Sequence, residues 1–128
     1  DAKIGEYVVV ARKDRRSENW FIGCITNEKE RTIKLPLDFL DSGSAYKATL
    51  YCDGDDADYL TNPYSVIISE REVNAGTVLL LNLKKGGGAA IRVEKNIVVR
   101  ITMTLSGGYV ISFNIPSCDF YTFSKSIL

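Results

Sequence analysis

The sequence predicts an all-β fold, in the form of a small antiparallel β-sandwich or Greek-key domain. Short segments rich in β-branched and aromatic residues recur about every twelve positions, and turn-forming residues separate them. No segment shows apolar residues at the 3.6-residue spacing of an amphipathic helix. Short strands at this spacing, without helices, are typical of antiparallel sandwiches and barrels.

Seven strands are expected in the first part of the chain, at residues 6–11, 19–26, 31–37, 46–52, 64–69, 77–83 and 89–93. The second of these is apolar on both faces, which predicts a central position in a sheet. Pro36 cannot donate a ladder hydrogen bond, so it indicates a sheet edge or a strand end. Residues 70–76 are expected to form a polar connection. The apolar segment 77–83 is expected to be buried in a sheet.

The end of the chain differs in character. Residues 96–105 alternate between apolar and polar side chains, and Ser106, Gly107 and Gly108 then lead into residues 109–115. This pattern predicts a β-hairpin. The sequence therefore predicts a domain over residues 1–95 and a C-terminal extension over residues 96–128 that carries the hairpin.

Composition and charge are those of one ordinary globular domain. The 128 residues include 45% hydrophobic and 25% charged side chains, and 16 basic residues balance 16 acidic ones. A chain of this size can bury one core. Because the net charge is zero, no overall field attracts nucleic acid or an anionic membrane, and we expect neither as a partner. No apolar run reaches the roughly 18 residues of a membrane span, and no signal peptide is expected at the N-terminus.

An acidic loop follows the strand at 46–52. Asp53, Asp55, Asp56 and Asp58 lie close together in the sequence, but the loop lacks the glycine and the closing glutamate of a calcium-binding loop. The leading interpretation is a solvated turn whose aspartates accept hydrogen bonds from their own backbone. The alternatives are a weak cation site and a surface that binds sugar hydroxyls or a neighbouring domain. The candidate sugar or interdomain surface consists of Tyr51, Asp53, Asp55, Asp56, Asp58, Tyr59 and Tyr64.

The residue types of this chain do not indicate a catalytic site. The chain has no histidine, which removes the commonest general base, the catalytic triads that use it and most zinc sites. Cys24, Cys52 and Cys118 are odd in number and lack the spacing of metal ligands. Two buried free thiols are favoured over a bridge between Cys24 and Cys52. We therefore expect neither a catalytic residue nor a metal or other cofactor in this chain.

Three further motifs have a structural interpretation and a functional one. Lys84 and Lys85 precede three glycines, but no Lys-Ser or Lys-Thr and no helix follow, so a tight turn is favoured over a phosphate loop. The basic residues within 12–16 are interleaved with Asp14, which favours a solvated hairpin loop over a nucleic-acid site. Trp20 is expected to anchor the core rather than to stack on a sugar.

Four segments resemble the C-terminal domain of glycoside hydrolase family 97, the bacterial α-glucosidase and α-galactosidase family. They are GEYVVVARK at 5–13, NWFIGCITNEKERTIKLPLDFL at 19–40, YKATLYCDGDDADYLTNPYSV at 46–66 and GGGAAIRV at 86–93. The resemblance implies a small all-β domain that follows a catalytic (β/α)8 barrel and serves interdomain packing and oligomerisation. The family's catalytic carboxylates and calcium ligands lie in other domains, so no catalytic residue is carried over.

The resemblance also implies a setting for the chain. It implies a parent glycosidase acting on α-linked oligosaccharides in the periplasm or after secretion, with the catalytic barrel as a partner and a homo-oligomer as a second. The alternative function is a carbohydrate-binding module for α-linked oligosaccharides, and an adhesion domain is a third possibility without a motif. Residues 96–128 have no counterpart in the family pattern. Their alternation favours a folded hairpin, which could join two chains by adding to a sheet edge, over a continuation foreign to the protein.

Overall fold

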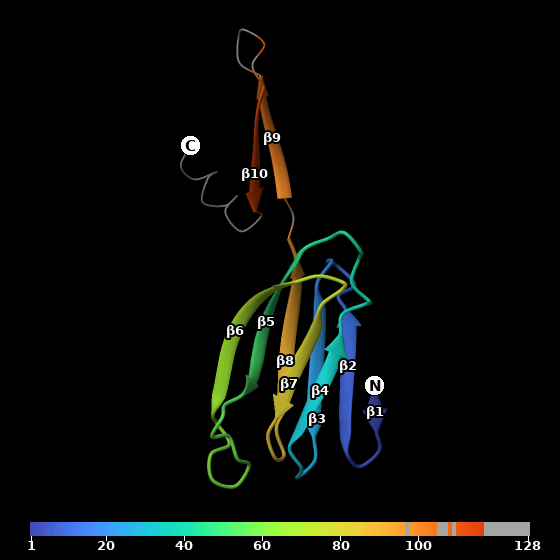
Figure 1. The fold of residues 1–128 in the computed structure, drawn as a ribbon, viewed down its shortest axis with the longest axis vertical. Helices are drawn as coiled ribbons and strands as arrows, with labels where there is room; N and C mark the ends of the chain where they lie inside the picture. The colour runs from blue at the N-terminus through green and yellow to red at the C-terminus, as the bar shows by residue number, and fades with distance from the viewer. Residues whose placement is uncertain (97, 105–107, 109, 117–128) are drawn as a thin grey trace. The chain divides into compact units, whose positions relative to one another are not determined.

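The computed structural model describes residues 1–96, 98–104, 108 and 110–116. The secondary structure of these residues consists of strands, without a helix, which confirms the all-β prediction (Figure 1). The chain divides into two compact units, Asp1–Lys95 and Asn96–Leu128, each of which makes most of its contacts within itself. In the second unit, the described residues form one antiparallel hairpin of two strands.

Three sheets contain the ten strands of the described residues. In the first unit, β1-β2-β3-β8-β5-β6 form a six-stranded sheet and β4 pairs with β7, while β9 pairs with β10 in the second unit. All these pairings are antiparallel. The strands are β1 (Ala2–Lys3), β2 (Tyr7–Lys13), β3 (Trp20–Thr26), β4 (Arg31–Pro36), β5 (Tyr46–Asp53), β6 (Val66–Val73), β7 (Val78–Leu83), β8 (Gly88–Lys95), β9 (Val98–Thr104) and β10 (Val110–Pro116).

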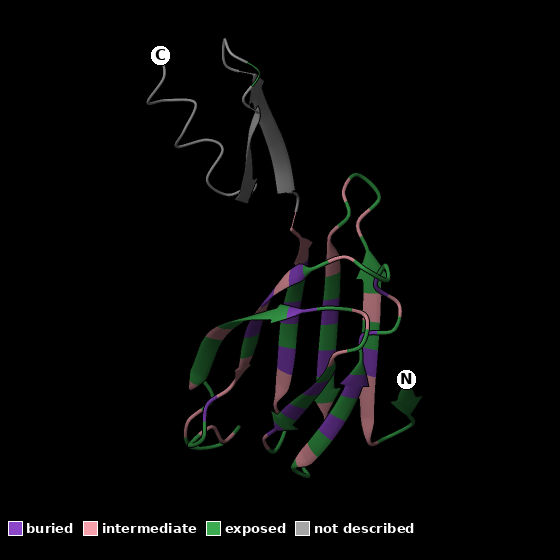
Figure 2. Ribbon diagram, turned by 45° about the horizontal axis from the view of Figure 1, so that its top comes forward, coloured by how far each residue is buried: buried purple, intermediate pink, exposed green. Residues whose placement is uncertain are grey.

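The core of the first unit lies between its two sheets. Buried and exposed residues alternate along the strands, so each strand turns one face inward (Figure 2). Both sheets contribute to one cluster of buried side chains, which is the arrangement of a β-sandwich. The largest fully buried side chains are those of Cys24, Leu37, Tyr46, Leu81, Leu83 and Val93.

One end of the sandwich is closed by the connection between β4 and β5. Within it, Leu40 is buried, and the ring of Phe39 lies 4.6 Å from the ring of Trp20, tilted by 48°. Trp20 therefore packs against the core, as predicted. The Asp41 N–H donates a hydrogen bond to the hydroxyl of buried Tyr46 (3.2 Å), and the Asp41 carboxylate pairs with Lys95 (2.8 Å).

Asn27 joins three connections of the first unit. Its side-chain amide donates to the carbonyl of Gly5 (2.9 Å) and its backbone N–H to the carbonyl of Glu6 (2.9 Å). Its own carbonyl accepts a hydrogen bond from the N–H of Gly86 (2.8 Å). Because these partners lie in the β1–β2 and β7–β8 connections, one residue fixes three turns against one another.

Three details differ from the sequence-based expectations. The two-residue strand β1 was not expected. Residues 70–76 were expected to be a connection, but β6 continues to Val73, because its charged residues lie on exposed sides of an edge strand while Val73 is buried. The prediction that 77–83 is buried in a sheet is wrong for one face, since Val78 and Leu80 are 55% and 59% exposed. Pro36 does end an edge strand, as expected.

Neighbouring leucines of β7 provide a test of this core. Leu81 is 1% exposed and Leu80 is 59% exposed. We expect Leu81→Ala to lower the free energy of unfolding by about 2–5 kcal/mol, because it leaves a cavity between the sheets. Leu80→Ala is the matched control and should change stability by less than about 0.5 kcal/mol. Urea unfolding of both variants measures the difference, and equal losses would contradict the inward orientation of Leu81.

Candidate functional site

The acidic loop connects β5 to β6 and is organised by its own hydrogen bonds. Asp58 accepts hydrogen bonds from the backbone N–H groups of Leu60 (2.9 Å) and Thr61 (3.1 Å). These donors hold the pKa of Asp58 below its usual value. This is the self-bonded turn that the sequence predicts.

Two further aspartates of the loop also accept hydrogen bonds. Asp56 accepts hydrogen bonds from the hydroxyl of Ser65 and from the amide of Asn62 (2.9 Å), and the Ser65 hydroxyl lowers the pKa of Asp56. Asp53 accepts from the backbone N–H of Lys84 (2.9 Å), while Asp55 is exposed. Among the described residues, no three histidine, cysteine or acidic side chains gather closely enough to hold a metal ion.

The three tyrosines of the candidate surface lie on different elements. Tyr51 lies in β5 and is 41% exposed, whereas Tyr59 and Tyr64 lie in the acidic loop and are 50% and 91% exposed. The side chain of Tyr59 lies against Gly86, because a Cβ added there would come within 3.1 Å of it. The exposed rings are therefore available for contact, but one belongs to a sheet and two to a loop.

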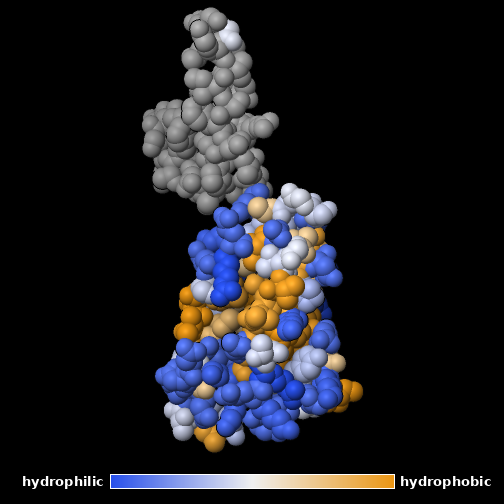
Figure 3. Space-filling view, in the orientation of Figure 1, coloured by the Kyte–Doolittle hydropathy of each residue, from blue (hydrophilic) through white to orange (hydrophobic). Residues whose placement is uncertain are grey.

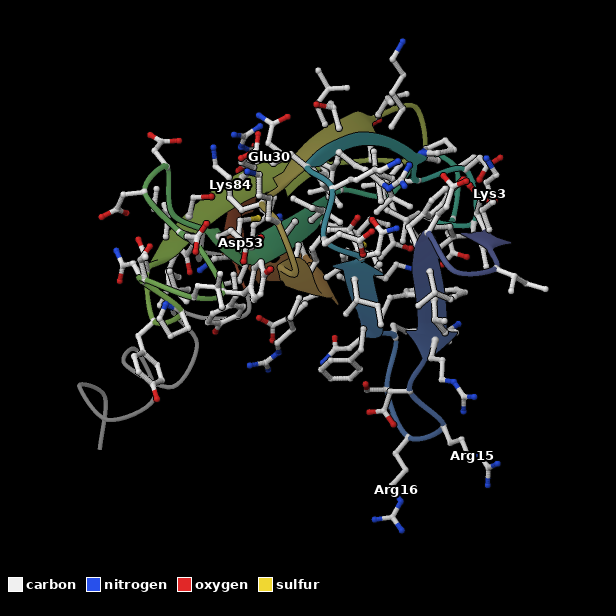
Figure 4. All side chains as sticks on the ribbon, turned by 90° about the horizontal axis from the view of Figure 1, so that it is seen from below. Lys3, Arg15, Arg16, Glu30, Asp53 and Lys84 are labelled. Carbon is white, nitrogen blue, oxygen red and sulfur yellow. The ribbon has the colours of Figure 1, made fainter. Side chains whose placement is uncertain are left out.

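The lysine and glycine motif forms a tight turn between β7 and β8. Gly87 donates a backbone hydrogen bond to the carbonyl of Lys84 (2.9 Å), and Gly86 has a positive φ of 64°. A Cβ on Gly87 would lie 2.0 Å from a carboxylate oxygen of Asp53. Figure 4 shows Asp53 and Lys84 close together at this end of the first unit. The tight-turn prediction is confirmed.

The basic run occupies the connection between β2 and β3. Arg15 and Arg16 project away from the sheets at its tip (Figure 4). Asp14 accepts hydrogen bonds from the N–H of Arg16 (3.1 Å) and the hydroxyl of Ser17 (2.6 Å), which lower its pKa. This agrees with the predicted solvated hairpin loop.

Cys24 and Cys52 are free thiols, and Cys118 lies outside the described residues. Both point to the inner face, but each pairs with Ala89 of β8, which lies between their strands. Two strand spacings separate their Cα atoms by about 9–10 Å, beyond the roughly 7 Å that a disulfide allows. Burial raises the pKa of Cys24 to about 11, so it is a thiol and not a nucleophilic thiolate at neutral pH.

A surface that sequence reasoning missed lies on part of the outer face of the six-stranded sheet. The strand registers align five residues in one row across five strands, from Val10 through Gly23, Ala90 and Tyr51 to Ile68. Phe21, Ile25 and Val66 flank this row and are 49%, 61% and 57% exposed. We call these eight residues the outer apolar face. Exposed apolar patches of this kind mark interaction surfaces.

A signal for this face is present in β3. Its two apolar faces predict a central strand, and β3 does lie between β2 and β8. One face is covered by the small sheet, whereas the other, with Phe21 and Ile25, is open. A strand that is apolar on both faces and open on one of them indicates that something outside this unit covers the second face.

These observations define the class of the protein: a β-sandwich domain with an exposed apolar row on the outer face of its larger sheet. A family described as "Glycosyl-hydrolase 97 C-terminal, oligomerisation" matches residues 1–94, and the chain belongs to this family. What matches is the non-catalytic C-terminal domain of larger glycosidases, as the sequence predicted. The described part of the chain contains no helix that could cross a membrane.

Two proteins of known activity or structure are similar to most of this chain. It is 34% identical over 94 residues to a retaining alpha-galactosidase of Bacteroides thetaiotaomicron, covering 73% of this chain and 13% of that protein. Structures of a family 97 enzyme from Pseudoalteromonas sp. strain K8, in complex with acarbose and with panose, match with 39% identity and a TM-score of 0.73. They cover 76% of this chain, which spans only 15% of those enzymes.

The raised pKa of Cys24 has a consequence for stability. Because the folded pKa of about 11 lies above the unfolded value near 8.5, the thiol stabilises the fold fully below about pH 8.5. This contribution is lost as the pH rises to about 11. We expect the free energy of unfolding to fall more steeply over this range in the native chain than in Cys24→Ala, as measured by urea unfolding at each pH. Equal slopes would contradict the assignment.

Proposed function

We propose that the unit Asp1–Lys95 attaches to the catalytic domain of a family 97 glycoside hydrolase through its outer apolar face. The observation that carries this proposal is the exposure of Phe21 and Ile25 at the centre of the sheet. Water contact with such side chains is unfavourable by about 25 cal/mol for each Å² of apolar surface. The small share of each relative that this chain covers supports a large catalytic portion as the covering partner.

The parent protein is proposed to hydrolyse α-glycosides. The α-galactosidase activity in the name of the Bacteroides relative supports an α-galactoside as substrate, and the wider family resemblance also includes α-glucosides. A periplasmic location is proposed from the same resemblance. The chain is proposed to serve assembly of the enzyme, in line with the oligomerisation described for its family.

A domain exchange tests the docking role. Residues 1–95 of this chain replace the C-terminal domain of the Pseudoalteromonas enzyme, and Phe21→Glu is compared with Val78→Glu, a half-exposed position on the small sheet. We expect Phe21→Glu to destabilise the chimera by about 1–3 kcal/mol, because it buries a carboxylate against an apolar partner. The measurements are thermal unfolding and the rate at which protease releases the domain.

Controls separate docking from folding. In the isolated chain Phe21 is 49% exposed, so Phe21→Glu should change its stability by less than about 1 kcal/mol. The Val78→Glu chimera should match the parent chimera in melting temperature and protease release. A Phe21→Glu chimera as stable and as resistant to protease as the Val78→Glu chimera would overturn the docking role of the outer apolar face.

Sugar binding is the second candidate function. The exposure of Tyr51, Tyr59 and Tyr64 favours it, because aromatic faces can stack on pyranose rings. The aspartates Asp53, Asp55, Asp56 and Asp58 would act as acceptors for sugar hydroxyls. Of these aspartates, Asp55 is exposed and accepts no hydrogen bond from the described residues, so it is the freest acceptor.

Titration with malto-oligosaccharides and α-galactosides tests this second candidate. If sugar binds, tyrosine and tryptophan fluorescence should change and calorimetry should record heat, and Tyr64→Ala should weaken both signals because this ring is 91% exposed. Val78→Ala is the control. Unchanged fluorescence and no heat at high sugar concentration would exclude the candidate.

A further inference from the structure

We propose that β6 pairs edge to edge with β6 of a second copy of this chain, antiparallel and about a two-fold axis at Ile67. This proposal rests on the assembly role proposed above and assigns it a surface. The paired strands would join two six-stranded sheets into one continuous sheet.

β6 is an open edge. It ends the six-stranded sheet, and in the part of the chain that the structure describes no strand pairs with its outer side (Figure 1). At the opposite edge, β1 has only two residues, whereas β6 has eight. A free edge carries unpaired N–H and C=O groups that can pair with another strand.

The open edge is apolar on both of its faces at one end. Val66, Ile67 and Ile68 are 57%, 49% and 63% exposed, and Figure 2 shows β6 largely as exposed. Hydrophobic atoms reach the left margin of the surface in Figure 3, where Figure 1 places β6. The register against β5 puts Ile68 opposite Tyr51 on the outer face and Ile67 opposite Cys52 on the inner face. On the inner face, Ile67 is therefore only half covered.

The sequence of β6 is self-complementary about Ile67. In an antiparallel pair centred there, Ile67 faces the partner's Ile67 and Val66 faces the partner's Ile68. Ser65 would then face Ser69 of the second copy. Such cross-strand pairs of β-branched residues stabilise sheets by roughly 0.2–1 kcal/mol each relative to alanine. Each exposed apolar residue of the strand would then lie beside an apolar residue of the second copy.

Other registers are less favourable. Centring the pair on Ser69 would place Ile68 against the partner's Glu70 and Ile67 against its Arg71. Centring it on Arg71 would place Glu70 against the partner's Glu72 and bring two arginines together, and like charges directly opposite destabilise a sheet. The charged half of β6 therefore disfavours the registers centred on Ser69 and Arg71. Glu70 is already paired with Lys47 in the same chain (2.9 Å).

Because of its symmetry, the edge pairing can be tested separately from the outer apolar face. A two-fold axis that relates neighbouring antiparallel strands is perpendicular to the sheet, so both outer apolar faces lie on the same side. Ile67 points to the other side. Substitutions at Ile67 therefore test the edge pairing without altering Phe21 or Ile25.

The first experiment measures the solution mass of the full chain over a wide range of concentration. We expect a dimer for the native chain and for Val78→Lys, the matched control on an exposed position of β7. Ile67→Lys should raise the dissociation constant at least about tenfold, because it places two lysines opposite each other on an edge. Circular dichroism and urea unfolding check that Ile67→Lys is folded. A native chain that stays monomeric would overturn the proposal.

The second experiment tests the register by cross-linking, in a background with Cys52→Ala and Cys118→Ser. Ile67→Cys should form a covalent dimer under mild oxidation, because the two Cα atoms face each other. Ser69→Cys should not, because its two copies would be about 14 Å apart, beyond the roughly 7 Å limit. Cross-linking through Ser69→Cys but not Ile67→Cys would overturn the register.

Two further outcomes distinguish this proposal from the proposed function. If a chain ending after Lys95 is monomeric while the full chain is a dimer, the hairpin unit and not β6 joins the copies. If Phe21→Glu, but not Ile67→Lys, dissociates the dimer, the outer apolar face is the self-association surface. Both results overturn the edge pairing, and neither decides whether that face also docks on a catalytic domain, which the domain exchange measures.

Discussion

The insertion of β8 between β3 and β5 is the constraint on which the rest of the structure depends. β8 joins β1, β2 and β3 on one side to β5 and β6 on the other, and its inner residues Ala89, Ile91 and Val93 form the middle of the core. Its start must approach β3 closely, because a Cβ on Gly88 would lie 2.5 Å from the carbonyl oxygen of Cys24. With β8 in place, the six strands form one sheet and the row of the outer apolar face becomes continuous.

Most strands could be predicted from the sequence because alternation of apolar residues is a local signal. The acidic loop was predictable for the same reason, since Asp58 bonds to residues two and three positions away. The continuation of β6 was missed, because Glu70 and Glu72 look like a turn until the strand is known to be an edge. The outer apolar face was missed because its residues become neighbours only through pairings between distant strands.

The inner and outer faces of the six-stranded sheet differ in what they contact. The inner face binds the small sheet and stabilises the domain, and it holds Cys24 as a buried thiol and Cys52 as a partly buried one. The outer face and the β6 edge both keep apolar side chains in contact with water. Exposed apolar residues of this kind are typical of interaction surfaces, which agrees with membership of a family described by oligomerisation.

The place of β8 in the chain also affects how the unit folds. It is the last strand of the first unit but lies near the middle of its sheet. In any partly folded state that lacks β8, the facing edges of β3 and β5 stay open. Non-local pairings of this kind are slow to form. Such a state exposes unpaired strand edges, which are prone to aggregation until β8 separates the two strands.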